Sequence, residues 1–172
     1  ELTTEALRDI EHIHIVACGT AMHAGMVGKT AIERLCRIPT DVDIASEFRY
    51  RDPIISKKDL VIIVSQSGET LDTFAALKLA KEKGAKTLAI VNVVGSSIAR
   101  AADYVMYTYA GPEIAVASTK AYSVQLAVLY IFSLRLALAL GTLTETEVRR
   151  YVKELGRLPD LLSGLLENTE EI

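Results

Sequence analysis

The sequence has 172 residues, 50% of them hydrophobic, and its 19 Lys plus Arg against 22 Asp plus Glu give a formal net charge of −3. This length and composition predict one domain that buries a core without help from metals or disulfides. The slightly negative charge excludes the basic surface of a protein that grips nucleic acid non-specifically, so no nucleic-acid partner is expected.

Cysteine usage and hydropathy indicate the cellular compartment in which the chain works. Cys18 and Cys36 have neither metal-ligand spacing nor the density of a secreted disulfide scaffold, which favours a reducing cytoplasm and predicts no metal site. The longest apolar run, Leu126 to Leu140, is shorter than the roughly 20 residues of a membrane-spanning helix, so we expect a buried or interface helix and no membrane partner. The start at Glu1, without methionine, suggests a piece of a longer protein.

Short β-rich runs alternate with segments of helical period along the chain. Five strands are predicted, at Ile13 to Ala17, Val42 to Ala45, Leu60 to Val64, Thr87 to Val91 and Tyr104 to Thr108. Helices are predicted at Thr20 to Arg37, at Thr70 to Lys83 with Gly84 as a left-handed cap, and from about Ser118 to about Leu140. A last, exposed helix should follow the capping-box pattern of Thr144 to Glu147.

This alternation predicts an α/β fold, a three-layer αβα sandwich with a five-stranded parallel sheet in the flavodoxin-like, doubly wound arrangement. Residues 1–172 contain no repeat or Pro/Gly-rich linker, so we expect a single domain, with a core at about 10–140 and a C-terminal helix at about 144–165. Ligands of such sheets bind beyond the carboxyl ends of the strands. The loops at those ends are therefore the places to look for a site.

The third predicted strand ends in Ser65-Gln66-Ser67-Gly68-Glu69-Thr70, directly before a helix. Three hydroxyls, the Gln66 amide and free backbone N–H groups at one helix start predict an anion site, and Gly68 lets the backbone approach closely. Neutral donors with a helix dipole suit a dianion that must be released again. The alternative is that Ser67 or Thr70 merely caps the helix. Glu69 would repel a phosphate unless its side chain points away.

Two other loops carry weaker signals. After the first strand, Gly19 permits a tight turn and Thr20 offers a hydroxyl, although an ordinary helix cap explains both, and His23 more simply packs or faces solvent. After the fifth strand, Val116, Ala117 and Ser118 could line a sugar, or Ser118 or Thr119 could cap the next helix while Glu113 is solvated.

Nucleotide motifs are absent from the sequence. Gly28-Lys29-Thr30 lies inside a predicted helix, and His23 stands where a phosphate-binding loop would need glycine. No Gly-x-Gly-x-x-Gly follows the first strand, which argues against a dinucleotide. No cofactor is therefore predicted.

Four segments together resemble one known family. Cys18-Gly19-Thr20, Ser46-Glu47-Phe48-Arg49-Tyr50, Ser65 to Thr70, and Glu113 with Val116 to Lys120 are similar to the isomerase half of glucosamine-6-phosphate synthases, the isomerising glutamine–fructose-6-phosphate aminotransferases. The resemblance covers nearly all 172 residues, and its order and spacing follow the first of the family's two sugar isomerase (SIS) subdomains.

The resemblance implies a substrate site. The family's serine-rich loop holds the phosphate of fructose 6-phosphate, its first loop contacts the sugar or phosphate, and its third loop lines the sugar pocket. The residues that carry over are Gly19, Thr20, Ser65, Gln66, Ser67, Thr70, Val116 and Ser118. Ala21 departs from the family's commoner serine, and Glu113 and Lys120 belong to the same motif without an assigned role.

The resemblance also implies that substrate binding and catalysis lie in different parts of the parent protein. The family isomerises an aldose–ketose pair after ammonia transfer, using a glutamate, a histidine and a lysine of the second subdomain or C-terminal tail. No catalytic residue is therefore expected here, and the piece should bind fructose 6-phosphate or glucosamine 6-phosphate without catalysing. Its expected partners are the glutaminase domain and second SIS subdomain of a parent chain, and a second copy in a homodimer.

Two other functions stay open at this point. A non-catalytic phosphosugar sensor of the same fold, such as part of a transcription regulator, would carry a DNA-binding segment elsewhere in its gene. A flavodoxin-like FMN carrier would be yellow and would be expected to place its hydroxyl-rich loop after the first strand rather than the third.

Overall fold

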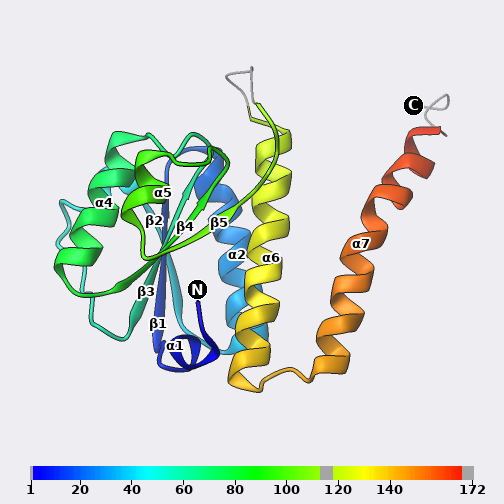
Figure 1. The fold of residues 1–172 in the computed structure, drawn as a ribbon, viewed down its shortest axis with the longest axis horizontal. Coiled ribbons are helices and arrows are strands. Elements are labelled where there is room, and N and C mark those ends of the chain that lie inside the picture. Colours follow the sequence, from blue (N-terminus) through cyan, green and yellow to red (C-terminus); the bar gives the residue numbers. More distant parts are fainter. Residues whose placement is uncertain (1, 113–117, 168–172) are drawn as a thin grey trace.

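The computed structural model describes residues 2–112 and 118–167 (Figure 1). The strands are β1 (His12–Ala17), β2 (Thr40–Ile44), β3 (Asp59–Ser65), β4 (Lys86–Val91) and β5 (Tyr104–Tyr107). The helices are α1 (Thr4–Arg8), α2 (Thr20–Cys36), α3 (Ala45–Phe48), α4 (Leu71–Glu82), α5 (Ser97–Ala101), α6 (Lys120–Leu140) and α7 (Glu145–Glu167).

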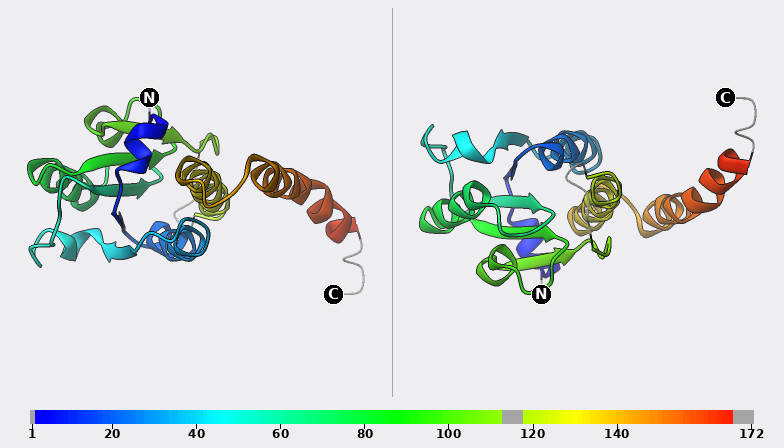
Figure 2. Two further views of the ribbon diagram at one scale, coloured as in Figure 1. Left: turned by 90° about the horizontal axis from the view of Figure 1, so that it is seen from below. Right: turned by 90° about the horizontal axis from the view of Figure 1, so that it is seen from above.

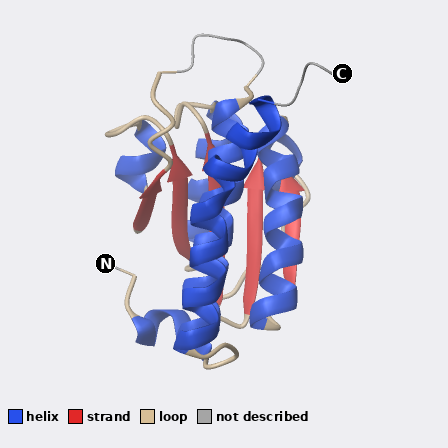
Figure 3. Cartoon of the chain, turned by 90° about the vertical axis from the view of Figure 1, so that its right-hand side faces the viewer, coloured by secondary structure: helices blue, strands red, loops and turns tan. Residues whose placement is uncertain are grey.

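The five strands form one parallel sheet in the order β2-β1-β3-β4-β5, which confirms the predicted flavodoxin-like topology. Helices cover both faces of the sheet, as the views along and across the strands show (Figures 2 and 3). The chain order reverses direction across the sheet between β1 and β3, so the loops after these two strands lie beside one crevice.

The core consists of two apolar clusters, one on each face of the sheet. Alternate residues of the central strands supply both, as expected when successive side chains of a strand point to opposite faces. Ile15 and Ile62 belong to the cluster under α1, α2 and α6, whereas Val61 and Ile63 belong to the cluster under α3, α4 and α5. Strand β3 is buried along its whole length, so the loop that follows it leaves a rigid platform.

The predicted ends of the elements differ from the structure at several places. The second strand ends at Ile44, because Ala45 begins the short helix α3. Helix α6 begins at Lys120, two residues after Ser118. Helices α3 and α5 were not expected from the sequence, because neither is long enough to display a helical period. The predicted capping box of α7 is confirmed, since the Glu147 carboxylate accepts from Thr144 N–H at 2.8 Å.

Helix α6 corrects the expectation that its apolar segment is too short to cross a membrane. The helix has 21 residues and passes that test by length and composition, but half of its most apolar window is buried. It packs beside α2, and residues such as Leu129 and Phe132 lie in the core (Figure 1). Within this fold α6 is a core helix, as expected.

Helix α7 extends away from the sandwich, next to the end of α6 (Figures 1 and 2). None of its described residues is buried. Its apolar residues include Leu158, Leu161, Leu162 and Leu165, which are exposed. A cavity of about 840 Å³ separates it from α2 and α6. The predicted exposed C-terminal helix is therefore confirmed, and its apolar residues contribute little to this core.

Candidate functional site

A small cavity opens at the carboxyl ends of β1 and β3, where the start of α6 meets the starts of α2 and α4. Its volume is about 170 Å³. It is lined by Cys18, Thr20, Ala21, Val64, Ser65, Gln66, Ser67, Thr70, Thr73, Ser118 and Gln125. Three segments that are far apart in the sequence thus meet at one place, and no described residue of this lining carries a formal charge.

Six of the eight predicted substrate residues line this cavity, namely Thr20, Ser65, Gln66, Ser67, Thr70 and Ser118. Gly19 lies directly before the cavity residue Thr20 and has a φ of +59°, which fits its predicted role of forming the tight turn into α2. Val116 lies outside the described residues, as does Glu113.

The two serines of the β3 loop are held by the backbone of their own turn. Ser65 Oγ accepts a hydrogen bond from Gly68 N–H at 3.0 Å, and Ser67 Oγ accepts one from Glu69 N–H at 3.2 Å. Ser65 Oγ also lies 3.5 Å from Thr70 Oγ1. Because both serine oxygens act as acceptors in these backbone contacts, their hydroxyl hydrogens can be donated to an anion in the cavity.

The start of α4 bears on whether these hydroxyls cap the helix. Thr70 is the N-cap residue of α4, and its side chain makes no capping hydrogen bond. The backbone N–H groups of Leu71, Asp72 and Thr73 form the first turn, where the helix geometry supplies no acceptor. The first turn therefore offers N–H groups, the helix dipole and a hydroxyl that does not cap the helix at one end of the cavity.

Glu69 does not bring its charge to the cavity. Its Oε1 accepts a hydrogen bond from Ser97 N–H at 2.7 Å, at the first turn of α5, and its side chain does not line the cavity. This bond lowers the pKa of Glu69, mainly because the backbone N–H stabilises the carboxylate. The repulsion of phosphate that the sequence left open is removed by this orientation.

Gly68 fixes the shape of the turn by its lack of a side chain. Its φ is +67°, and a Cβ atom there would lie 2.1 Å from Ser96 Oγ and 2.6 Å from Ser96 Cβ. Gly68 C=O accepts a hydrogen bond from Ile98 N–H at 3.0 Å. The loop after β3 is thus locked against the start of α5, and only glycine fits both the backbone angle and the space.

Five residues of the cavity lining were not predicted as substrate residues, namely Cys18, Ala21, Val64, Thr73 and Gln125. Thr73 and Gln125 are 1% and 3% exposed. Gln125 is a buried amide within an otherwise apolar stretch of α6, and this contrast is the signal that could have identified it. Thr73 and Cys18 carry no such signal, because small residues of this kind are common in cores.

Asn92 supports the loop after β5, and sequence reasoning missed it too. Its Oδ1 accepts from Thr108 Oγ1 at 3.1 Å and from Ala110 N–H at 2.8 Å, while its Nδ2 donates to Gly111 C=O at 2.8 Å. Lys120 Nζ donates to Pro112 C=O at 2.6 Å. These bonds hold residues 110–112, the first part of this loop, close to the start of α6.

Comparison with known proteins places this geometry in a family. The family model described as "SIS domain" matches residues 6–135. The chain is 59% identical over 171 residues to the glutamine–fructose-6-phosphate aminotransferase (isomerizing) of Caldanaerobacter subterraneus, and 56% identical over 170 residues to that of Clostridium tetani. Each alignment covers 99% of this chain and 28% of the relative, so the chain spans less than a third of these proteins.

A solved structure agrees with the sequence comparison. The C-terminal domain of glucosamine-fructose-6-phosphate aminotransferase from Francisella tularensis superposes with a TM-score of 0.91 at 42% identity. The superposition covers 95% of this chain and 47% of that chain. The fold described above is thus about half of that C-terminal domain.

Proposed function

The chain belongs to the SIS domain family, and from this premise we propose that it is the sugar-phosphate-binding subdomain of a glutamine–fructose-6-phosphate aminotransferase. Its ligand is fructose 6-phosphate or glucosamine 6-phosphate, in accordance with the activity named for its relatives. The observation that carries the proposal is the uncharged cavity at the start of α4, where hydroxyls and backbone N–H groups converge.

The phosphoryl group is assigned to the β3 loop and the first turn of α4. Ser65, Ser67 and Thr70 donate hydroxyl hydrogen bonds to its oxygens, and the Gln66 amide adds another donor. The helix dipole compensates the negative charge without a lysine or arginine in the described lining. Binding through neutral donors suits a product that must leave after each turnover.

The sugar chain extends from the phosphate toward the other two loops. Gly19 and Thr20 of the first loop and Ser118 at the start of α6 are assigned to its hydroxyls, and Val116 to its apolar side. The cavity is smaller than the several hundred cubic ångströms typical of a complete ligand site. This size supports a site that holds one end of the substrate and is completed by other parts of the parent protein.

In the parent enzyme, this subdomain positions the substrate and the remaining parts supply the chemistry. We assign no acid–base role to its residues, because no described lining residue of the cavity is a carboxylate, a histidine or a lysine. The acid–base groups, the glutaminase domain and the second SIS subdomain belong to the parent chain. A cytoplasmic location accords with two free cysteines, Cys18 and Cys36.

The exposed apolar face of α7 is evidence that another domain packs against this chain. The groove between α7 and the sandwich is lined by apolar residues such as Met26, Leu134 and Leu158. We assign the second SIS subdomain of the parent chain to this face, since this chain covers only 47% of the related C-terminal domain. Homodimerisation is the other expected association. Light scattering measures the mass of the isolated chain in solution, and a dimer mass would indicate that two copies associate.

Isothermal titration tests the proposed ligand class. The chain should bind glucosamine 6-phosphate and fructose 6-phosphate, and glucosamine without phosphate should give no heat, because the phosphoryl group carries the recognition. Equal binding of the phosphorylated and unphosphorylated sugars, or no heat from either phosphosugar at millimolar concentration with the chain folded, would overturn the proposal.

A further inference from the structure

A cluster of histidines and aspartates lies on one face of the sheet, outside the cavity. His12 and His14 are two residues apart on β1, so their side chains point to the same face. In the parallel register, Asp41 of β2 pairs with His14, and Asp59 of β3 pairs with His12. Three neighbouring strands thus bring two imidazoles and two carboxylates together.

Three of these side chains are close enough to share one ion. His12 Nε2 lies 3.1 Å from Asp41 Oδ2. The rings of His12 and His14 lie 4.4 Å apart, centroid to centroid. One ligand atom from each of His12, His14 and Asp41 lies within 4.8 Å of the other two. Ligands at about 2.0 to 2.2 Å from a tetrahedral ion are roughly 3.3 Å apart, so this spacing needs only small side-chain rotations.

His14 is the member that the fold alone leaves unexplained. It is 3% exposed and packed edge-on to Phe48, and neither of its ring nitrogens makes a hydrogen bond with the residues that the structure describes. Asp59 Oδ2 lies 3.5 Å from His14 Nε2, at the long limit of a hydrogen bond, and the same carboxylate accepts from Ser56 at 2.9 Å (N–H) and 2.8 Å (Oγ). A buried imidazole with so weak a contact is costly, and such groups in proteins call for an explanation.

We propose that His12, His14 and Asp41 bind one zinc ion, with a water molecule as the fourth ligand and with Asp59 orienting the His14 ring. Two imidazoles and a carboxylate form a donor set that zinc accepts in tetrahedral geometry. A carboxylate beside a metal-bound histidine is a common arrangement that fixes the ring.

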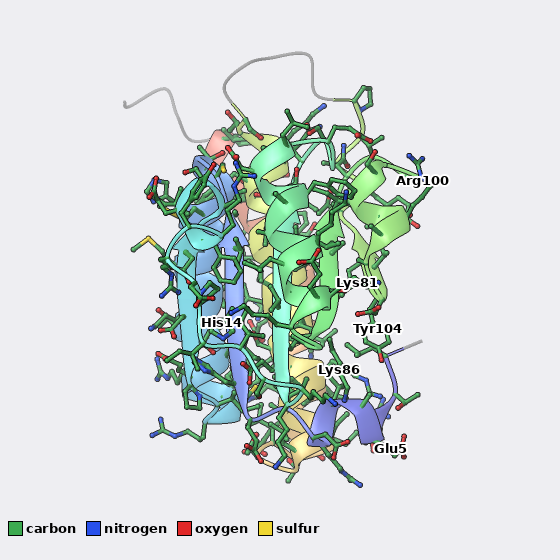
Figure 4. All side chains as sticks on the ribbon, turned by 90° about the vertical axis from the view of Figure 1, so that its left-hand side faces the viewer. Glu5, His14, Lys81, Lys86, Arg100 and Tyr104 are labelled. Atoms are coloured by element: carbon green, nitrogen blue, oxygen red, sulfur yellow. The ribbon has the colours of Figure 1, made fainter. Side chains whose placement is uncertain are left out.

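The zinc site is separate from the phosphosugar cavity. Cys18 follows His14 by four residues, just beyond the end of β1, which is about 13 Å at the rise of a strand. Figure 4 shows His14 among the strands, well below the upper edge where they lead into the loops. A metal at this place joins β1 to the edge strand β2, so its expected effect is on stability rather than on ligand binding.

The test uses the 172-residue chain after chelator treatment, with ZnCl₂ in calorimetric titration and CoCl₂ as a spectroscopic probe. We expect one zinc per chain, the visible absorption of tetrahedral cobalt, and a rise in the thermal unfolding temperature on addition of zinc. His12→Gln and Asp41→Asn should each weaken zinc affinity at least about tenfold. Both side chains are partly exposed, at 33% and 53%, so these variants should fold.

His23→Gln is the matched control. His23 is exposed on α2, away from the three strands, and its replacement should leave zinc affinity and the stabilisation unchanged. The proposal is overturned if His12→Gln and Asp41→Asn bind zinc as tightly as the wild-type chain, or if the wild-type chain binds no zinc at concentrations that saturate ordinary structural sites. A cobalt spectrum of octahedral type would also contradict it.

Discussion

The carboxylate of Glu69 accepts a hydrogen bond from the backbone N–H of Ser97 at 2.7 Å, and this contact turns the only charged side chain of the β3 loop out of the cavity. The same carboxylate lies beside the first turn of α5, where an anion is favoured by the helix end. One residue therefore joins two helices and leaves the hydroxyls of Ser65 and Ser67 in neutral surroundings.

Glu69→Gln tests this arrangement. If the carboxylate already points away from the phosphate, removing its charge should change the affinity for glucosamine 6-phosphate by less than about twofold, whereas a carboxylate facing the site would make the variant bind more tightly.

Because folding lowers the pKa of Glu69 below 4.5, its contribution to stability is present above that pH and is lost as the pH falls through the lowered value. Acid unfolding should accordingly begin at a higher pH in Glu69→Ala than in the wild-type chain.

Ser67→Ala removes one hydroxyl donor to the proposed phosphate. We expect it to cost about 1 to 3 kcal/mol of phosphosugar binding free energy, because a hydrogen bond to a charged oxygen is lost. The free energy of unfolding should change little, because Ser67 is only half-buried. Calorimetric titration and urea unfolding measure the two quantities. Ser163→Ala, on the exposed surface of α7, is the matched control; unchanged affinity in Ser67→Ala would assign Ser67 to the turn alone.

Gly68→Ala should distort the turn that carries the hydroxyls. The alanine meets two penalties, a positive φ and a Cβ atom 2.1 Å from Ser96 Oγ. Gly95→Ala meets only the first, since its φ is +72° and no atom lies within 4 Å of the added Cβ. We expect Gly95→Ala to lose about 1 to 2 kcal/mol of stability and Gly68→Ala clearly more, with phosphosugar binding lost only in the latter. Equal effects of the two substitutions on binding would contradict this account of the loop.

The two cysteines should react differently with a thiol reagent. Burial raises the pKa of Cys36 to about 12, and its Sγ donates to Ser133 C=O at 3.2 Å, so this thiol should be inert at pH 8 in the folded chain. Cys18 is half-buried and lines the cavity, so it should be the one that is labelled. Glucosamine 6-phosphate should slow the labelling of Cys18. Labelling of Cys18 at the same rate with and without ligand would contradict the assignment of this cavity.

The sequence predicted the sheet and its long helices because they carry strong periodic patterns. Residues 60–64 of β3 form an unbroken apolar run, as a central parallel strand requires, and α2 and α4 display apolar residues at helical spacing. The serine-rich loop was found from its position after β3, and the convergence of Thr20 and Ser118 on that loop follows from the topology once the strand order is known.

The remaining features depend on contacts that a linear pattern does not contain. The direction of Glu69 depends on where α5 begins, and α5 is too short to be predicted. Gln125 reaches the cavity only because α6 packs beside α2, and the supporting role of Asn92 depends on loop carbonyls distant in sequence. The pairing of His12 and His14 with aspartates likewise depends on the register of three strands.

Two-dimensional amide NMR of the isotopically labelled chain, titrated with glucosamine 6-phosphate, tests the central claim most directly. We expect the largest chemical-shift changes on the backbone amides of residues 65–73, with smaller ones near Thr20 and Ser118. We expect no comparable change on β2 or α7. A folded chain whose β3 loop and first turn of α4 show no change at saturating ligand, or whose changes lie elsewhere, would contradict it.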